Sequence, residues 1–252
     1  MSLRRVVRAV APESLRIAVA RARRAWRDAG SRPRVAARSA ATGFDHRVLE
    51  VVQEIKPTAF LEGKMANIGL SAARLDGVVV APGEMLSFWA LVGRPSEAAG
   101  FATGRSIRGG VVGGEIGGGL CQVSGIAYEA GLRAGLIVVE RHPHSRDLYD
   151  EADRFTPLGL DATVVWPYKD LRLSNPLTVP VQFRFALREL TLVASIYAPS
   201  PLKPATIEIE RTDREGWREV QVFRRTARGE AQPISDDLYP APPAVAPFRR
   251  GG

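Results

Sequence analysis

Hydrophobic residues recur every three or four positions in the first half of the chain, which is the spacing of one buried helix face. This pattern predicts helices in "FDHRVLEVVQEI" at 44–55, in "MANIGLSAARLDG" at 65–77, and over 120–134. Gly77 and Gly135 end the last two segments, and glycine is common just after a helix end. Residues 44–135 are therefore expected to contain three helices.

The second half instead carries short β-branched runs and alternating segments, both of which indicate strands. They are "LIVVERHPHS", "LDATVVW", "DLRLSN", "VPVQFRFAL", "LTLVASIYA" and a long hairpin in "TIEIERTDREGWREVQVFRRT". Between the halves, "VVVAPGEMLSFWALVG" predicts a strand, a Pro-Gly turn and an extended segment, and residues 100–119 are rich in glycine. This order favours an α+β fold: N-terminal helices, then a mainly antiparallel β-sheet, with a cysteine-bearing helix after a glycine-rich loop.

Composition divides the chain into four parts. The chain has 252 residues, 45% of them hydrophobic, which is enough for a substantial core. We expect a basic helical arm at 1–42, a central domain at 43–200, a β-hairpin extension at 201–230, and a disordered tail at 231–252. The tail is assigned because it contains the proline-rich "YPAPPAVAPFRRGG".

The positive charge lies in the N-terminal arm. Residues 1–42 hold eleven arginines against Glu13 and Asp28, a net charge of +9, whereas the whole chain carries +8 and the remainder therefore −1. A near-neutral domain argues against nucleic acid as a partner. "PESLRIAVARARRAWRDAG" predicts an amphipathic helix, which we interpret as a solvated, loosely docked extension, with peripheral contact to an anionic membrane as the alternative.

The location expected from the sequence is cytoplasmic, at most peripheral to the inner face of the membrane. No run of eighteen apolar residues is present, and the N-terminus lacks an apolar segment followed by a cleavage site. The single cysteine, Cys121, excludes an intramolecular disulfide, so the fold does not depend on an oxidising compartment.

Cys121 is the leading candidate for a reactive group. It falls in the first turn of the helix predicted from Leu120, where unpaired amides and the helix dipole lower the pKa of a thiol. The preceding glycines can adopt positive φ and expose amides to a ligand oxygen. The candidate substrate-binding residues in and after this turn are Glu115, Gly117, Gly118, Gly119, Gln122 and Ser124.

Two histidines follow the predicted helix by one short strand. If "RHPHSR" is extended, His142 and His144 point to the same side, since strand side chains repeat every two residues. Either imidazole would then take the proton of the thiol, and Asp161 or Asp170 would hold that imidazole in one tautomer. Tyr168 lies beside Asp170 and is a further candidate for substrate contact.

Two other interpretations of the same residues remain open. Cys121, His142, His144 and Glu115 are ligands suited to zinc, although structural zinc sites usually offer paired cysteines, and we expect no cofactor. Alternatively, Cys121 is a small core residue, the glycines permit close packing, and the histidines lie in an ordinary loop.

Three long segments resemble the VanW-like family, which is named from a vancomycin-resistance gene cluster. They are "PGEMLSFWALVG" at 82–93, "GGGLCQVSGIAYEAGLRAGLIVVERHPHS" at 117–145 and "GLDATVVWPYKDLRLSNPLTVPVQFRF" at 159–185. The resemblance implies a link to the bacterial envelope and no assigned reaction. Many relatives have Thr-Thr after "CQVS", where this chain has Gly125 and Ile126, which removes a hydroxyl at 125 from any mechanism.

Together these observations give two hypotheses of different classes. In the first, Cys121 is the nucleophile of a hydrolase or acyl transferase that acts on a peptidoglycan-related small molecule or peptide. In the second, the glycine loop and the histidines bind such a ligand without turnover, as an accessory protein. Zinc binding by the same cysteine and histidines is a third possibility.

Overall fold

The structure is a computed structural model that describes residues 12–240 except 31–32, 41, 58, 109–110, 146–153 and 226–228. Its α+β class confirms the prediction. The helices are α2 (Glu13–Ala29), α3 (Leu61–Leu75), α4 (Phe88–Val92) and α5 (Leu120–Arg133), with a 3₁₀ turn at Glu97–Ala99.

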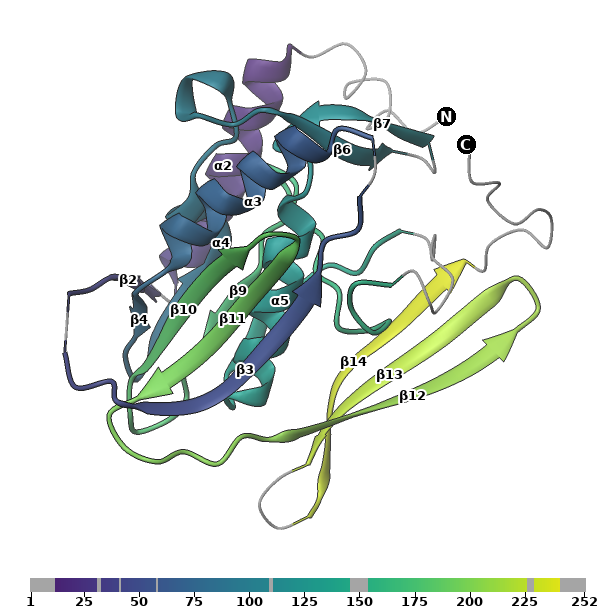
Figure 1. Cartoon of the computed structure of the whole chain (residues 1–252). Helices are drawn as coiled ribbons and strands as arrows, with labels where there is room; N and C mark the ends of the chain where they lie inside the picture. The colour runs from purple at the N-terminus through teal and green to yellow at the C-terminus, as the bar shows by residue number, and fades with distance from the viewer. Residues whose placement is uncertain are drawn as a thin grey trace.

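A five-stranded antiparallel sheet forms one side of the molecule. Its strand order is β2 (Ala37–Arg38), β4 (Val78–Val80), β10 (Val181–Arg188), β11 (Thr191–Ala198) and β3 (His46–Glu54). Helices α3 and α5 cover one face of this sheet (Figure 1).

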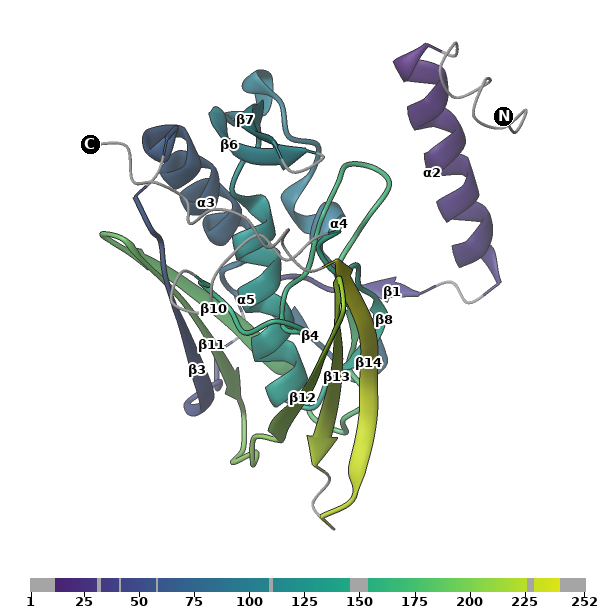
Figure 2. The ribbon, with the colours of Figure 1, turned by 90° about the vertical axis from the view of Figure 1, so that its right-hand side faces the viewer.

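Three smaller sheets complete the fold. The order of the first is β1 (Arg34–Val35), β5 (Glu84–Ser87), β9 (Arg172–Ser174) and β8 (Ile137–Glu140). The second is β12 (Thr206–Arg214), β13 (Trp217–Arg225) and β14 (Ala231–Pro240), and the third is the hairpin of β6 (Thr103–Arg108) and β7 (Val111–Ile116). Helix α5 lies between the five-stranded sheet and the β12–β14 sheet (Figure 2).

Helix α5 is the centre of the core because it is apolar or small on every side, as expected for a fully buried helix. Gly131 allows close approach, since a Cβ there would lie 2.5 Å from Cδ1 of Leu173. Every α5 residue except Cys121 and Arg133 is buried. The helix is therefore exposed only near its two ends, and the thiol lies at the N-terminal one.

The predicted helix at 44–55 is wrong, because residues 46–54 form β3. Val51 and Gln53 are buried and the residues beside them are exposed, which is the two-residue alternation of a strand paired along its whole length with β11. The helical spacing read from this segment arose because its apolar residues also fall three and four apart.

Three further segments differ from the sequence prediction. The glycine-rich region is largely the β6–β7 hairpin, and residues 88–92 form α4 rather than an extended segment. "LDATVVW" forms no strand and makes a single bridge, between Val165 and Lys169. Helices and strands consequently alternate as far as α5, whereas among the described residues after α5 the elements are all strands, as predicted for the second half.

The two terminal parts are more integrated than the sequence suggested. Residues 231–240, assigned to the disordered tail, form β14, and that assignment is wrong for them. Pro233 fits because β14 is an edge strand with a register shift at this point. In the basic arm, α2 is confirmed, but β1 and β2 join the arm to two sheets. Residues 241–252 lie outside the described residues.

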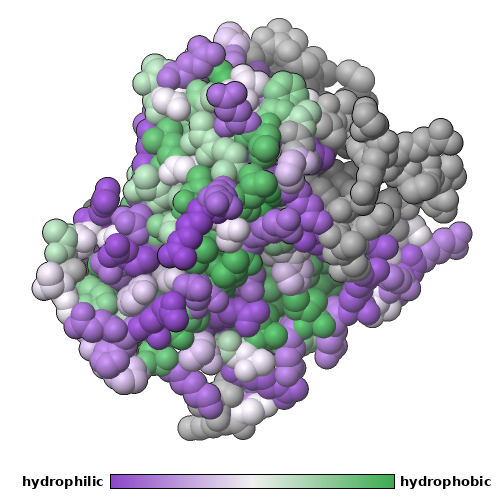
Figure 3. Space-filling view, in the orientation of Figure 1, coloured by the Kyte–Doolittle hydropathy of each residue, from purple (hydrophilic) through white to green (hydrophobic). Residues whose placement is uncertain are grey.

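On the face seen in Figure 3, hydrophobic residues form separate groups among hydrophilic ones. Within the described part of the chain, no helix combines the length and the apolar character that crossing a membrane requires.

Candidate thiol and imidazole site

Cys121 stands in the first turn of α5, directly after a turn formed by glycines. Gly117 and Gly119 have φ of 82° and 101°, as the sequence predicted, and Gly119 is the residue that precedes the helix. The side chain is only partly buried, and Sγ lies 3.9 Å from the carbonyl oxygen of Val164. This accessible position does not fit a simple core cysteine.

His144 connects the thiol to a carboxylate. Its Nδ1 lies 2.6 Å from Oδ2 of Asp161, and its backbone N–H donates to the same oxygen at 2.7 Å. Its imidazole also hydrogen-bonds the thiol of Cys121. Thiol, imidazole and carboxylate therefore form one hydrogen-bonded chain.

The charges in this hydrogen-bonded series of side chains favour a thiolate and an imidazolium. Burial raises the pKa of the Cys121 thiol, but the hydrogen bond and charge of His144 outweigh burial and the pKa is lowered overall. Burial lowers the pKa of His144, but hydrogen bonding to Asp161 and to the thiol outweighs burial, and the pKa is raised overall. These opposite shifts are those of an ion pair, whose two protons titrate together.

Asp161 is held in its ionised form from several directions. Burial raises its pKa, but hydrogen bonding to His144 and the charge of Arg141 hold it well below its usual range. Arg141 Nη2 donates to Oδ1 of Asp161 at 2.8 Å, and the Tyr239 hydroxyl donates to the same oxygen at 2.7 Å. The carboxylate is thus fixed on both of its oxygens.

Sequence reasoning missed Arg141 and Tyr239. The Arg141 side chain is 4% exposed, contacts Asp161 and Asp237, and lies 5.3 Å from the ring centroid of Tyr128. Its position directly before His142 was a usable signal. Tyr239 gave none, because it is surrounded by prolines in a segment that composition assigned to disorder.

His142 and Asp170 take part in a neighbouring cluster of hydrogen bonds rather than in the series that contains the thiol. His142 Nε2 lies 3.1 Å from Oε1 of Glu140, which also accepts from the backbone N–H of Asp170 at 2.9 Å. The Asp170 carboxylate accepts from the Ser87 hydroxyl at 2.7 Å. The expectation that both histidines point to one side is wrong, because β8 ends at Glu140 and the histidines lie beyond it.

Most of the other candidate residues serve the local fold. Gln122 Nε2 donates to the carbonyl of Glu54 at 3.0 Å, and Ser124 Oγ donates to the carbonyl of Ala162 at 2.6 Å. Both side chains are buried and engaged by backbone. Tyr168 is 42% exposed in the turn after Val164, and Glu115 lies half-buried on β7. None of these four is placed against the thiol by a hydrogen bond.

The glycines before Cys121 are needed for close packing. A Cβ on Gly118 would lie 2.2 Å from the backbone of Gly104, and its carbonyl accepts from the Asn67 side chain at 2.9 Å. The Gly118 amide donates to the carbonyl of Glu115 at 2.9 Å, so it is not free for a ligand. Gly117 and Gly119 provide the positive φ.

We expect Gly118→Ala to lower the free energy of unfolding by at least about 2 kcal/mol, because backbone must move to admit the methyl group. Gly113→Ala is the matched control: no atom lies within 4 Å of its added Cβ and its φ is not positive. The free energy of unfolding of that control should stay within about 0.5 kcal/mol of the wild-type value. Urea unfolding measures both, and equal stabilities would contradict the packing role.

Two cations lie beside the glycine turn. A Cβ on Gly119 would lie 2.8 Å from Cγ of Lys64, and a Cβ on Gly118 would lie 2.7 Å from the carbonyl oxygen of Arg105. Burial, together with the charge of Arg105, lowers the pKa of Lys64 to about 8. Among the described residues, neither side chain has an acidic partner, and Arg105 Nε is buried without a bond. Sequence reasoning missed both cations.

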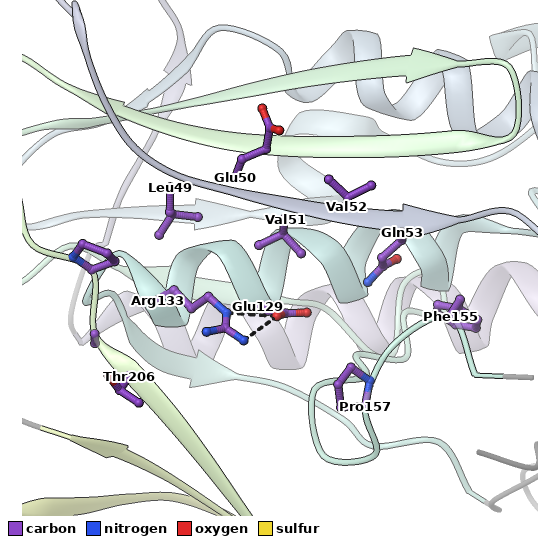
Figure 4. A pocket seen from close by; sticks show the side chains of 12 residues that line it. Leu49, Glu50, Val51, Val52, Gln53, Glu129, Arg133, Phe155, Pro157 and Thr206 are labelled. Atoms are coloured by element: carbon purple, nitrogen blue, oxygen red, sulfur yellow. Dashed lines mark hydrogen bonds and ion pairs between the residues drawn. The ribbon is translucent and has the colours of Figure 1, made fainter. Parts of the chain in front are cut away.

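A separate cavity of about 520 Å³ lies towards the other end of α5 (Figure 4). Its wall includes Gln53, Phe155, Pro157 and the ion pair of Glu129 with Arg133. The Gln53 side chain is 2% exposed, and neither of its amide atoms is bonded among the described residues. No residue predicted as a site lines this cavity.

The zinc interpretation is not supported by the side-chain arrangement. His142 is bonded to Glu140 and His144 to Asp161, so the two imidazoles are engaged by different carboxylates. Within the described part of the chain, no three His, Cys, Asp or Glu side chains converge in a way that would hold a metal ion.

The fold and site define an α+β protein in which a helix-start cysteine, a histidine and an aspartate are hydrogen-bonded in series. The chain belongs to the VanW-like family, whose description "VanW like protein" matches residues 63–197. No solved structure matches the chain.

Two curated relatives share this region. The chain is 35% identical over 132 residues to uncharacterized protein YoaR of Bacillus subtilis (strain 168), covering 52% of this chain and 42% of that protein. It is 27% identical over 139 residues to vancomycin B-type resistance protein VanW of Enterococcus faecalis (strain ATCC 700802 / V583), covering 55% and 50%. The chain thus spans at most half the length of these relatives.

Proposed function

We propose that this protein is a thiol-dependent acyl transferase or hydrolase in which Cys121 is the nucleophile. The observation that carries the proposal is the hydrogen-bonded series of Cys121, His144 and Asp161, in which the pKa of the thiol is lowered and that of the imidazole raised. A nucleophile, a base and a group that orients the base are the three parts that covalent acyl transfer requires.

The reaction begins with attack of the Cys121 thiolate on a carbonyl carbon, which forms a C–S bond and a tetrahedral oxyanion. We assign the oxyanion to the amide of Cys121 itself, in the first turn of α5. The neighbouring amides of Gly118, Leu120 and Gln122 already donate to backbone carbonyls. Protonated His144 then gives its proton to the leaving group as the tetrahedral carbon collapses to a thioester.

The second half of the reaction releases the acyl group. Neutral His144 takes a proton from water, or from an acceptor amine or hydroxyl, as that molecule attacks the thioester carbon. The C–S bond breaks and Cys121 leaves as the thiolate. Throughout, Asp161 keeps Nδ1 of the imidazole protonated and directed at its own carboxylate, so that Nε2 serves the thiol and the substrate.

The cations beside the glycine turn favour a negatively charged substrate. Lys64 on α3 and the backbone of Arg105 on β6 border the turn that leads to Cys121, and the charge of Arg105 acts on Lys64. Neither side chain has an acidic partner among the described residues. A carboxylate on the substrate would compensate both charges. Peptidoglycan-related peptides carry such carboxylates, and the relative named for vancomycin resistance supports a substrate of this class and a role in the envelope or in glycopeptide resistance.

The experiment that tests the proposal is acylation by p-nitrophenyl acetate, followed by intact mass. We expect a burst of nitrophenolate and one added acetyl group on Cys121 in the wild type, and neither in Cys121→Ala. His144→Ala should slow the burst by about 100-fold, the lower range of general acid–base contributions. His142→Ala is the matched control and should acylate at the wild-type rate. Equal rates for the two histidine variants would disprove the assigned base.

A second candidate function is ligand binding without turnover, as an accessory protein. It is favoured by the cavity of about 520 Å³ at the other end of α5, where the buried Gln53 amide is unbonded among the described residues. In this case Cys121→Ser would leave the biological effect of the protein intact, whereas the acyl-transfer proposal expects its loss with the fold preserved.

A further inference from the structure

Helix α2 is attached to the rest of the protein by the face that carries its ion-paired residues Arg24 and Asp28. Its four partly buried residues, Ile17, Ala20, Arg24 and Asp28, are spaced three and four apart and so share one side of the helix. Arg24 pairs with Glu140 at 3.1 Å and Asp170 at 3.0 Å. No α2 residue is fully buried, so ion pairs and partial contacts hold the helix in place.

The second attachment is a bidentate pair at the C-terminal end of α2. Both guanidinium Nη atoms of Arg172 donate to the carboxylate oxygens of Asp28, each at 2.9 Å. Arg172 is 9% exposed, so this pair is partly shielded from solvent. With Arg24 one turn earlier, it fixes which side of α2 faces the protein.

The opposite side of α2 is apolar and faces solvent. Leu15, Val19 and Trp26 are 54%, 41% and 81% exposed. At 3.6 residues per turn, these three lie on the side opposite Arg24 and Asp28. The exposed alanines of the same side are Ala18, Ala22, Ala25 and Ala29. A helix docked on its own protein normally buries such a stripe, and here the arrangement is reversed.

Arginines border the exposed stripe. Arg16, Arg23 and Arg27 are exposed and lie along one edge of it, and the only acid of α2 outside the Asp28 pair is Glu13. Figure 2 shows α2 at the margin of the molecule, joined to the sheets through β1. Apolar side chains flanked by exposed cations suit a surface that is apolar beneath and negatively charged above.

We propose that α2 binds the protein peripherally to an anionic lipid surface, with Leu15, Val19 and Trp26 entering the boundary of headgroups and acyl chains. The arginines at the edge of the stripe contact lipid phosphates. A second copy of this chain is the less suitable occupant, because self-association through this face would bring the same arginines together. This inference does not depend on the chemistry of Cys121.

The test is co-sedimentation of the full chain with two kinds of vesicle: pure phosphatidylcholine, and phosphatidylcholine mixed with phosphatidylglycerol. We expect binding to the mixed vesicles and little to the neutral ones. The double variant Val19→Glu, Trp26→Glu should bind at least about 10-fold more weakly, since two apolar side chains are withdrawn from the interface. Arg23→Ala should weaken binding to the mixed vesicles about 5-fold, which is the contribution of one arginine near an anionic surface.

Trp217→Glu provides the matched control, because Trp217 is 49% exposed on β13, away from α2. It should bind the mixed vesicles like the wild type, and circular dichroism should show all variants folded. Equal binding by the double variant and the wild type would overturn the proposal. A lipid-free dimer lost only in the double variant would assign the stripe to a second copy and would also overturn it.

Discussion

Replacing His144 by alanine is expected to slow alkylation of Cys121 by iodoacetamide at neutral pH by about 10-fold or more, one pKa unit being a factor of ten in thiolate. The thiolate is the species that reacts, and His144 is what lowers the pKa of this partly buried thiol. Without the imidazolium, burial and the charge of Asp161 raise the pKa of the thiol, and only the hydrogen bond with the Val164 carbonyl still lowers it. The rate is measured by mass spectrometry of the alkylated protein across pH.

The pH profile distinguishes this role from a structural one. In the wild type, alkylation should persist below the ordinary pKa of a thiol, whereas in His144→Ala it should follow a pKa above that value. The two rates should converge at high pH, where both thiols are ionised. His142→Ala is the control, since His142 is bonded to Glu140, and it should keep the wild-type profile. A thiol that reacts only after unfolding would contradict the site.

Arg141→Ala is expected to lower the free energy of unfolding by about 3–5 kcal/mol, the usual cost of removing one partner of a buried ion pair. Arg141 is almost fully buried between Asp161 and Asp237, so its loss removes the cation paired with Asp237 and leaves Asp161 with His144 alone as its cationic partner. Urea unfolding measures the effect. Arg211→Ala removes a more exposed ion pair, that with Asp213, and should lower the free energy of unfolding by no more than about 1 kcal/mol.

The same substitution carries a pH signature. In the wild type the pKa of Asp161 is held below its usual range, so its contribution to stability is complete above that range and is lost as the pH falls through the lowered pKa. In Arg141→Ala this acid-dependent part should shrink. An Arg141 variant as stable as the Arg211 variant would show that the buried cluster is not needed for the fold.

Patterns that belong to one element were predictable from the sequence. The three-and-four spacing before Gly135 located α5, and the glycines before it located the positive φ at Gly117 and Gly119. The residue types of the site followed from the same stretch, because a helix-start cysteine and a downstream histidine are both local signals. Asp161 was predicted as a further candidate, because a strand was expected to return it to the neighbourhood of the histidines.

Features that depend on pairing between distant elements were not predictable. The spacing of apolar residues in His46–Glu54 is compatible with either a helix or a strand. The segment is a strand because it pairs with the neighbouring β11. The choice of His144 over His142 depends on where β8 ends, one residue before Arg141. Likewise, the cations Lys64 and Arg105 reach the glycine turn from α3 and β6, which no spacing along the chain reveals.

The position of Tyr239 has a consequence for how far the functional unit extends. The family match ends at residue 197, yet the hydroxyl that fixes one oxygen of Asp161 comes from β14, more than forty residues later. A fragment trimmed to the matched region would retain cysteine, histidine and aspartate while opening the far side of the carboxylate to water. The boundaries of a working unit of this chain therefore follow the carboxylate's contacts more closely than the family match.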